Sequence, residues 1–350
     1  MDTDIAMILL ADGLAGSAIY MLFGLGLVLI FSVTRVIFVP FGSMAVFAAL
    51  SLAAMENGQT PAAIKLVVLF VLIVLAMEFL RLLRLRQMWL MPKTLISWGL
   101  LPLIPCGIAW WAASLDSETL RVVAAILLVV PLGPLVERAV LRPIANASVL
   151  SLLIVALVLD LVLSGLGLLW FGPEGLRTKA ELEGTLALSS NFSIRYQTLL
   201  TMGTALVLAF VFYFGFQRTR LGKVLHATAS NPVGARLVGI RPAYTAVVAH
   251  VIGAFLAGIV GVLISPIITI YYDTGLMLAL KAFVAAIIGG FFSYPLTALG
   301  ALLVGVSESY ASFWNSGLKD AIVFGLLIPV LVFRSYFASR AELDEEEEDV

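Results

Sequence analysis

The sequence predicts an all-α integral membrane protein, a polytopic helical bundle of about 11 hydrophobic segments that includes broken or half-spanning helices. Apolar residues make up 61% of the 350 positions, and 12% are charged. Soluble domains carry about 25% charged residues, so this composition indicates a membrane protein. Apolar runs of suitable length recur along the chain, since a bilayer core of ~30 Å needs about 20 helical residues. Their lack of strict alternation excludes a barrel.

The hydrophobic segments follow one another with short polar loops between them, and some are short enough to be half-spans. Helices are expected, because in lipid a helix satisfies its own backbone groups. The segments are Gly13–Thr34, Val36–Met55, Ala62–Met77, Thr94–Leu115, Val122–Val136, Ala147–Trp170, Thr198–Phe216, Ala246–Ile264, Thr274–Phe292, Leu296–Tyr310 and Ala321–Phe333.

These segments form one transmembrane domain over residues 1–340, and residues 341–350 form a disordered, solvated acidic tail. Met1–Ile5 carries two aspartates in place of a basic start, so no cleavable signal peptide is expected. The single Cys106 excludes an internal disulfide and argues against a thiol catalyst. The tail holds seven acids: Glu342, Asp344, Glu345, Glu346, Glu347, Glu348 and Asp349.

Basic residues predict the orientation in the membrane. They gather in loops that follow the third, fifth, seventh and eleventh segments, all odd-numbered. By the positive-inside rule these loops are cytoplasmic, which places the N-terminus outside and the C-terminus in the cytoplasm. The residues are Arg81, Arg84, Arg86, Lys93, Arg138, Arg142, the basic residues of 218–241, Arg334 and Arg340.

The cytoplasmic loop over residues 217–245 contains the clearest local signal. Its basic residues are accompanied by no acid between Phe214 and Arg241. Within it, Asn231 can cap free N–H groups, Pro232 suits the first helical position, and Gly239 suits a left-handed stop. A short helix over Asn231–Val238 is therefore predicted. Such a helix on a basic cytoplasmic loop indicates a docking element for another protein.

Two places resemble broken membrane helices, which transporters use to hold substrate. In the first, Pro40 interrupts an apolar run and small residues follow. The second begins at Ser265-Pro266 and continues to Gly275; an ordinary turn at the membrane boundary is the alternative there. The candidate substrate-path residues at these breaks are Thr34, Pro40, Gly42, Ser43, Tyr272, Asp273 and Thr274.

Charged residues inside the predicted spans are further candidates for the path. Asp160 lies near the middle of Ala147–Trp170, where a charge costs ~3 kcal/mol or more, so a partner or a function is expected. It could line the path, pair with Lys281, or serve as a structural, hydrogen-bonded aspartate. Lys281 and Glu308 are candidates as well. The two histidines are distant in sequence and do not make a metal site.

Several stretches, in the same order along most of the chain, resemble the permease subunits of the branched-chain amino acid and urea class of bacterial ABC importers. No single stretch would suffice. The stretches are Tyr20–Leu27, Val28–Ile37, Val136–Pro143, Arg218–Lys223, Ala227–Asn231, Gly258–Leu263, Leu280–Gly290 and Lys319–Ala321.

The resemblance implies a permease of the bacterial inner membrane with a homologous second permease subunit, two cytoplasmic ATP-binding subunits and an extracytoplasmic substrate-binding protein. The predicted short helix then corresponds to the coupling helix that enters an ATPase cleft. Its coupling residues are Asn231, Pro232, Ala235, Arg236, Leu237 and Gly239. The chain has no G-x-x-x-x-G-K-[ST] loop, because Leu221–Val224 has the wrong spacing, so ATP chemistry is assigned to partner chains. No cofactor is expected.

The chain departs from the family pattern in two ways. The first break reads Phe38–Gly42, where the family usually has an Asn-Phe-Ala-His-Gly-like sequence. This loss of polar groups puts a branched-chain amino acid substrate in doubt, so urea, amides and small carboxylates stay open. The segment 62–115 also resembles an insertion of two helices, which would preserve the topology.

Two other functions compete with that of an importer permease. An ion-coupled secondary transporter would use Asp160 as its ion site and would need no docking helix. A membrane-embedded enzyme would need a nucleophile or metal set, and one cysteine with two scattered histidines argues against it.

Overall fold

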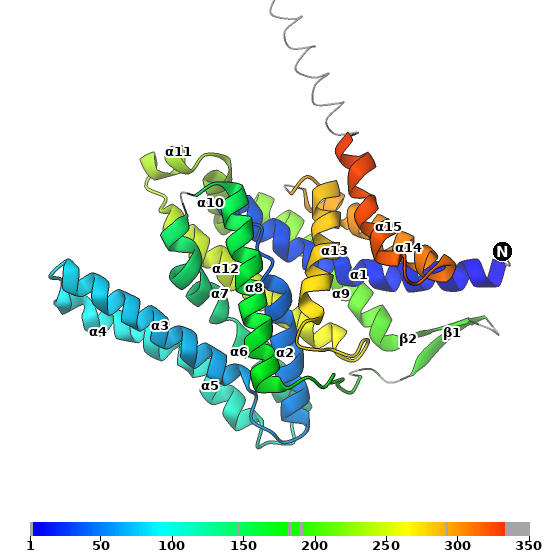
Figure 1. The fold of residues 1–350 in the computed structure, drawn as a ribbon, viewed down its shortest axis with the longest axis horizontal. Helices are drawn as coiled ribbons and strands as arrows, with labels where there is room; N and C mark the ends of the chain where they lie inside the picture. The colour runs from blue at the N-terminus through cyan, green and yellow to red at the C-terminus, as the bar shows by residue number, and fades with distance from the viewer. Residues whose placement is uncertain are drawn as a thin grey trace, which may run out of the picture.

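The structure is a computed structural model that describes residues 3–332, apart from 146, 181, 183, 190, 191 and 292. It is a helical bundle with eight helical stretches long and apolar enough to cross a membrane within this described part, and it includes shorter apolar helices at 41–56 and 274–288. The predicted all-α class is confirmed (Figure 1). The acidic tail and the basic residues Arg334 and Arg340 lie outside the described residues.

The first half of the chain is entirely helical where it is described. Its elements are α1 (Thr3–Thr34), α2 (Phe41–Glu56), α3 (Ala63–Arg84), η1 (Met88–Leu90), α4 (Met91–Thr94), η2 (Leu95–Leu100), α5 (Leu101–Ala112), α6 (Glu118–Val129), α7 (Leu132–Val136), η3 (Glu137–Leu141), η4 (Arg142–Ile144) and α8 (Val149–Phe171).

The second half adds a small hairpin to the helices. Its elements are β1 (Thr185–Ser189), β2 (Phe192–Arg195), α9 (Tyr196–Arg218), α10 (Arg220–Ser230), α11 (Pro232–Leu237), α12 (Pro242–Ile264), α13 (Thr274–Ile288), α14 (Tyr294–Trp314) and α15 (Lys319–Gly325). The strands pair antiparallel, with Thr185 opposite Arg195. The hairpin lies in the loop between α8 and α9.

Each predicted hydrophobic segment coincides with helix, although the ends differ. α1 begins at Thr3, well before the predicted Gly13. α3 continues to Arg84, because basic side chains in a last turn can extend to the membrane surface while their stems cover apolar area. The last segment contains α15, and its final residue Phe333 lies outside the described part.

α1 is the centre of the bundle and packs against α9, α12, α13 and α14. It is buried on all sides over much of its length, which fits its uniformly apolar sequence. α12 packs against α2 and α6 through small residues. Gly261 lies so close to the Ala45 carbonyl of α2 that a Cβ would overlap it, and Gly258 lies against the backbone of Ile126 in α6. Small residues on one helix face thus permit the close approach of neighbouring membrane helices.

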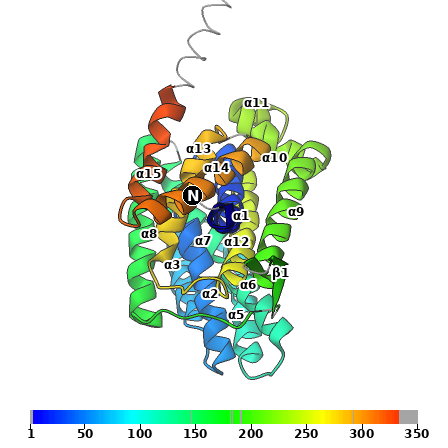
Figure 2. The ribbon, with the colours of Figure 1, turned by 90° about the vertical axis from the view of Figure 1, so that its right-hand side faces the viewer.

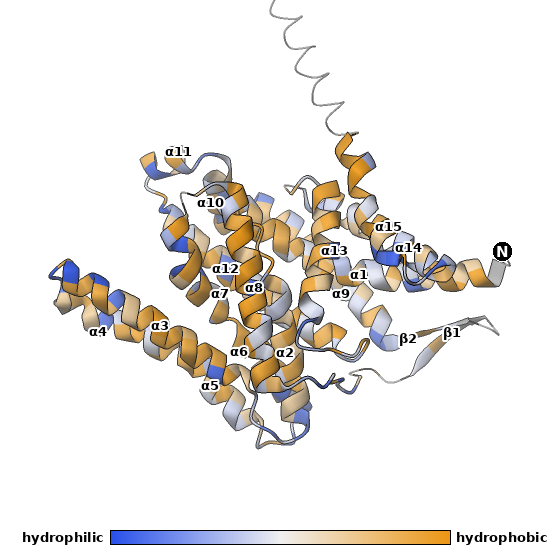
Figure 3. Cartoon of the chain, in the orientation of Figure 1, coloured by the Kyte–Doolittle hydropathy of each residue, from blue (hydrophilic) through white to orange (hydrophobic). Residues whose placement is uncertain are grey.

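The α3–α5 hairpin extends away from the bundle to one side, and β1–β2 extends to the other (Figures 1 and 2). Glu78 of α3 anchors the hairpin by an ion pair with Arg138 of η3, and it also pairs with Arg81 of its own helix. Figure 3 shows hydrophilic residues at the tip of the hairpin and around α11, while α8 is hydrophobic along most of its length. The interpretation of 62–115 as an inserted pair stays a prediction.

Candidate functional site

The two predicted helix breaks lie against each other. α2 begins just after the first break and α13 just after the second. Gly42 and Gly275 are in such close backbone contact that a Cβ on either would overlap the peptide group of the other. The breaks were predicted separately, and nothing local in the sequence indicates that they touch. In this structure the junction is closed by backbone packing.

Asp160 stabilises the start of α2 at this junction. Its Oδ1 accepts a hydrogen bond of 2.6 Å from the Ser43 hydroxyl, and the backbone N–H of Ser43 also lies close. Ser43 is in the first turn of α2, where N–H groups have no partner within the helix. The side chain of Asp160 is fully buried, and its Oδ2 has no hydrogen-bond partner of ordinary geometry among the described residues. The half-helix start is therefore capped by the protein's own carboxyl group.

The first break is filled by aromatic packing. Phe38 lies edge-on to His250 with ring centroids 5.0 Å apart, and Phe41 lies edge-on to Phe23 at 5.6 Å. His250 Nδ1 is 2.9 Å from the Ala246 carbonyl. At the first break, where the family usually has polar residues, Phe38 and Phe41 of this chain are buried in the core.

Lys281 pairs with other acids, so the alternative in which it pairs with Asp160 is wrong. Its Nζ lies 2.6 Å from Glu308 of α14 and 2.8 Å from Asp320 of α15. Tyr20 of α1 donates a hydrogen bond to the same Glu308. The hydrogen bond from Lys281 holds the pKa of the Asp320 carboxyl below its usual value. This cluster joins four helices around one buried ammonium group.

The second break is covered by the loop between α8 and α9. Arg177 donates hydrogen bonds of 2.7 Å and 2.9 Å to the carbonyls of Pro266 and Ile267, and Thr178 bonds to Ser265 at 2.7 Å. Asp273 occupies the N-cap position of α13 but makes no side-chain capping bond. Sequence reasoning missed Arg177, because its partners are backbone carbonyls distant along the chain.

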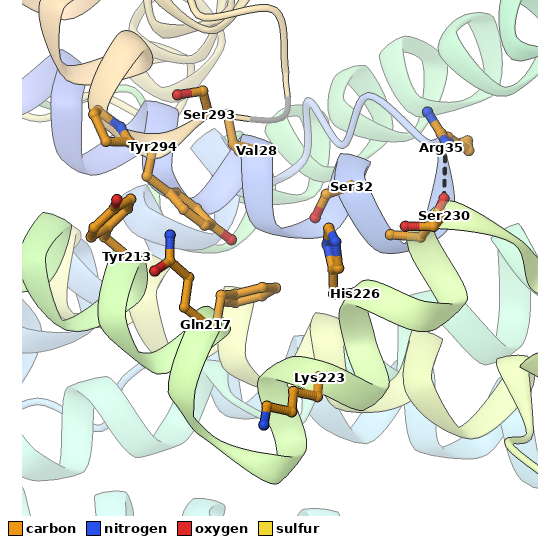
Figure 4. Close-up of a pocket in the computed structure, with 13 residues that line it drawn as sticks. Val28, Ser32, Arg35, Tyr213, Gln217, Lys223, His226, Ser230, Ser293 and Tyr294 are labelled. Carbon is orange, nitrogen blue, oxygen red and sulfur yellow. Dashed lines mark hydrogen bonds between the residues drawn. The ribbon is translucent and has the colours of Figure 1, made fainter.

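Two cavities have none of the individually predicted path residues in their walls. One, of about 540 Å³, lies between the ends of α1, α9, α10 and α14 (Figure 4). The other, of about 310 Å³, lies beside Arg177 and Pro266. Neither is lined by Thr34, by the residues of the Gly42–Gly275 junction, or by Lys281. Among the described residues, no group of three metal-binding side chains comes together.

The predicted docking helix forms α11. Asn231 Oδ1 accepts from the N–H groups of Val233 and Gly234 at 3.1 and 2.8 Å. At the other end Gly239 has a φ of +86°, and the N–H groups of Gly239 and Ile240 donate to the carbonyls of Arg236 and Ala235. This pair of bonds is the Schellman ending that a left-handed glycine permits. The helix is one residue shorter at each end than the predicted Asn231–Val238, and both of its ends follow from local sequence.

Comparison with known proteins agrees with a membrane transport subunit. The model of the family described as branched-chain amino acid transport system / permease component matches residues 9–331, and the chain belongs to this family. The resemblance drawn from the sequence is confirmed. The chain is a permease subunit of an ABC transporter, multi-pass in the inner membrane, and is not an enzyme.

Curated relatives with similar sequences are transport permeases by name. The high-affinity branched-chain amino acid transport system permease protein BraD of Pseudomonas aeruginosa is 31% identical over 230 residues, which cover 63% of this chain and 75% of BraD. LivH of Escherichia coli, a permease of the same description, is 31% identical over 217 residues, 60% of this chain and 70% of LivH. No solved structure matches the chain.

Proposed function

We propose that this permease forms part of the substrate path of an importer and that α11 transmits the motion of a cytoplasmic ATPase to it. The partners are a homologous second permease subunit, two ATP-binding subunits and an extracytoplasmic binding protein. The observation that carries the proposal is α11 itself. It is a short helix outside the membrane spans, capped by Asn231 at its start and ended by Gly239. Its apolar side chains are exposed to solvent: Val233, Leu237 and the following Val238 are 66%, 85% and 75% exposed.

Such a surface is costly in water and favourable against a partner. Apolar area removed from water contributes about 25 cal/mol per Å². Arg236 is exposed on the same helix and can pair with an acidic group. Only Ala235 of α11 is buried, so one face of the helix packs against the rest of the protein and the opposite face is exposed.

The arrangement of loops supports an outside N-terminus. α11 and the tip of the α3–α4 hairpin lie at one side of the molecule, and the N-terminal end of α1 and the β1–β2 hairpin lie at the opposite side (Figure 1). Basic residues belong to the first group of loops, and they stay in the cytoplasm by the positive-inside rule. The α11 side is then cytoplasmic, where an ATPase can reach it.

A continuous set of contacts leads from α11 to the junction of the two breaks. α12 begins five residues after α11 ends, and its Gly261 touches Ala45, one turn from Gly42. α12 ends at Ile264, directly before the second break. We infer that displacement of α11 moves α12 and parts Gly42 from Gly275. Ser43, Asp160, Tyr272 and Thr274 then become accessible to substrate.

The substrate is proposed to be a small polar solute, with a branched-chain amino acid as the first candidate because the relatives carry that name. Urea, amides and small carboxylates follow, since Phe38 and Phe41 replace polar groups at the first break. Uptake of each labelled solute by the reconstituted complex would distinguish them.

The decisive experiment is purification of the tagged chain from its native membrane, with identification of what accompanies it. An ATPase and a second permease should be recovered, and Arg236→Glu combined with Leu237→Glu should remove the ATPase. Arg218→Glu is the matched control, because it inverts a charge of the same loop outside α11. A chain that is recovered alone and transports solute in liposomes without ATP would contradict the proposal.

A further inference from the structure

The larger cavity carries positive charge at the end of the bundle that the proposed orientation places in the cytoplasm. It lies where α1 and α9 end, α10 follows and α14 begins. Arg35, Lys223 and His226 contribute to one side, and Gln217, Ser293 and Tyr294 contribute to the other (Figure 4). Of the 13 described residues that line it, none is acidic. The start of the 21-residue helix α14 at Tyr294 adds the partial positive charge of a helix N-terminus.

Tyr294 supplies a buried donor with an unmet hydrogen-bonding need. Its side chain is 7% exposed, and its ring is held against Phe212 and Phe216 of α9 at centroid distances of 5.9 and 5.3 Å. Figure 4 shows its hydroxyl directed into the cavity. Ser32 lies close enough to interact, yet the hydroxyl makes no hydrogen bond of ordinary geometry with the described residues. Buried polar groups are rarely left this way, so an acceptor from outside the chain is expected.

Arg35 is fixed at the rim of the cavity. Its Nη2 donates to the Ala229 carbonyl of α10 at 2.8 Å, and its backbone has a φ of +59°, unusual for a residue with a side chain. Lys223 and His226 are exposed and stand one turn apart on α10, so they share a face. Basic side chains from the end of α1 and from α10 therefore line one space.

The cavity adjoins an apolar face that lipid can cover. Tyr213, Phe216 and Gln217 line it from the last turns of α9. The preceding turns of α9 expose Leu206, Val207, Phe210 and Val211. A ligand that fills both regions has an anionic head and an apolar tail. Basic pockets between helices at the cytoplasmic side are typical binding places for anionic lipid headgroups.

We propose that this cavity binds the phosphate headgroup of an anionic phospholipid, with the acyl chains along the exposed face of α9. The headgroup oxygens accept from Tyr294, Gln217 and the basic side chains. A volume of about 540 Å³ is within the ordinary range for ligand sites. The same hydrogen-bond donors and positive charges would also bind a free phosphate ion. The experiment therefore has to distinguish a lipid headgroup from free phosphate. The proposal is independent of α11 and of the transported substrate.

The test is native mass spectrometry of the full-length chain titrated with phosphatidylglycerol or phosphatidylcholine. Lys223→Gln combined with His226→Asn should weaken phosphatidylglycerol binding by roughly tenfold, because charge-assisted hydrogen bonds are lost, and should leave phosphatidylcholine binding unchanged. Arg218→Gln combined with Arg220→Gln is the control: it removes two charges of the same loop that do not line the cavity. If both double variants weaken phosphatidylglycerol binding equally, the lipid is attracted by the total charge of the loop and not by this cavity. That result would overturn the proposal.

Tyr294→Phe provides a second variant that keeps the ring packing. It should weaken phosphatidylglycerol binding by about threefold while the unfolding temperature is unchanged, because one hydrogen bond is removed. Inorganic phosphate alone at millimolar concentration should not displace bound phosphatidylglycerol. Displacement by phosphate, or a Tyr294→Phe variant that binds phosphatidylglycerol as tightly as the parent, would overturn the lipid assignment.

Discussion

At Gly42 and Gly275 the absence of a side chain permits the backbones of α2 and α13 to touch. Gly42 is helical, so its role here is close approach and not unusual backbone geometry. At the same junction a carboxyl group from α8 caps the start of α2 through Ser43. The two glycines act by leaving space for the opposite backbone, and the Ser43–Asp160 pair acts by hydrogen bonding at the start of α2. A small substitution can therefore test each role.

Gly42→Ala should destabilise the closed junction by about 1–3 kcal/mol, because the added methyl group meets the Gly275 peptide and not a flexible side chain. Thermal unfolding of the purified chain measures the loss. Gly165→Ala in α8 is the control, since nothing lies within 4 Å of its would-be Cβ. That change should be neutral or stabilising by up to ~1 kcal/mol. Equal stability of the Gly42→Ala protein and the parent would contradict the close contact.

Ser43→Ala should cost about 1–3 kcal/mol of unfolding free energy, because it leaves the buried Asp160 carboxyl without its hydroxyl partner. Ser51→Ala is matched to it: Ser51 is fully buried in the same helix, and its hydroxyl has no partner among the described residues. It should change stability by less than ~0.5 kcal/mol. Chemical denaturation of the three proteins provides the comparison. A loss of the same size in both variants would contradict the capping role.

At the scale of elements, α15 is tied to the bundle by the cluster around Lys281. Because Lys281 lowers the pKa of Asp320, this pair contributes stability above the ordinary pKa of an aspartate, and the contribution is lost as pH falls through the lowered folded-state value. Lys281→Met removes the cation and leaves the part-buried Glu308 carboxylate beside Tyr20 without it. Asp320→Asn removes the half-exposed partner alone.

Lys281→Met should therefore lower the unfolding temperature more than Asp320→Asn at neutral pH, since an unpaired buried charge costs more than a lost exposed partner. Lys319→Gln, one residue before Asp320 in the same helix, is the control and should have no effect. As pH falls from about 5 through the lowered folded-state pKa of Asp320, the difference between the parent and Asp320→Asn should shrink steadily. Persistence of that difference in acid would contradict the ion pair between Lys281 and Asp320.

The elements also show what local sequence can specify. Both ends of α11 follow from Asn231, Pro232 and Gly239, whose effects are confined to neighbouring residues. Pro40 likewise predicted the break before α2. The contact between Gly42 and Gly275, and the cavity around Tyr294, could not be predicted, because they depend on how helices distant in sequence pack. The sequence suggests Lys281 as a path residue because it shows no nearby partner for the charge. Its partners Glu308 and Asp320 are distant in sequence and meet it only in the folded structure.

At the scale of the whole molecule, the helix that would meet the ATPase and the junction that would open are far apart, and α12 connects them. Gly261 lies directly against the Ala45 carbonyl with no flexible side chain between them, and we propose that this contact transfers displacement from α12 to α2. Contact alone does not establish coupling, so the connection has to be tested by separating docking from transport.

Gly261→Ala should retain ATPase co-purification, because α11 is unchanged, and should lose most substrate transport, because the added methyl group meets the Ala45 carbonyl. Gly253→Ala, on the same helix, is the matched control. Its added methyl group meets the flexible end of Ile30, which can move aside, so docking and transport should both persist. Uptake of labelled solute and recovery of the ATPase would be measured for each variant. Parental transport by Gly261→Ala would place the route elsewhere. Loss of the ATPase from Gly261→Ala would mean that docking depends on the packing of α12, and the two ends of the molecule would then not be separable.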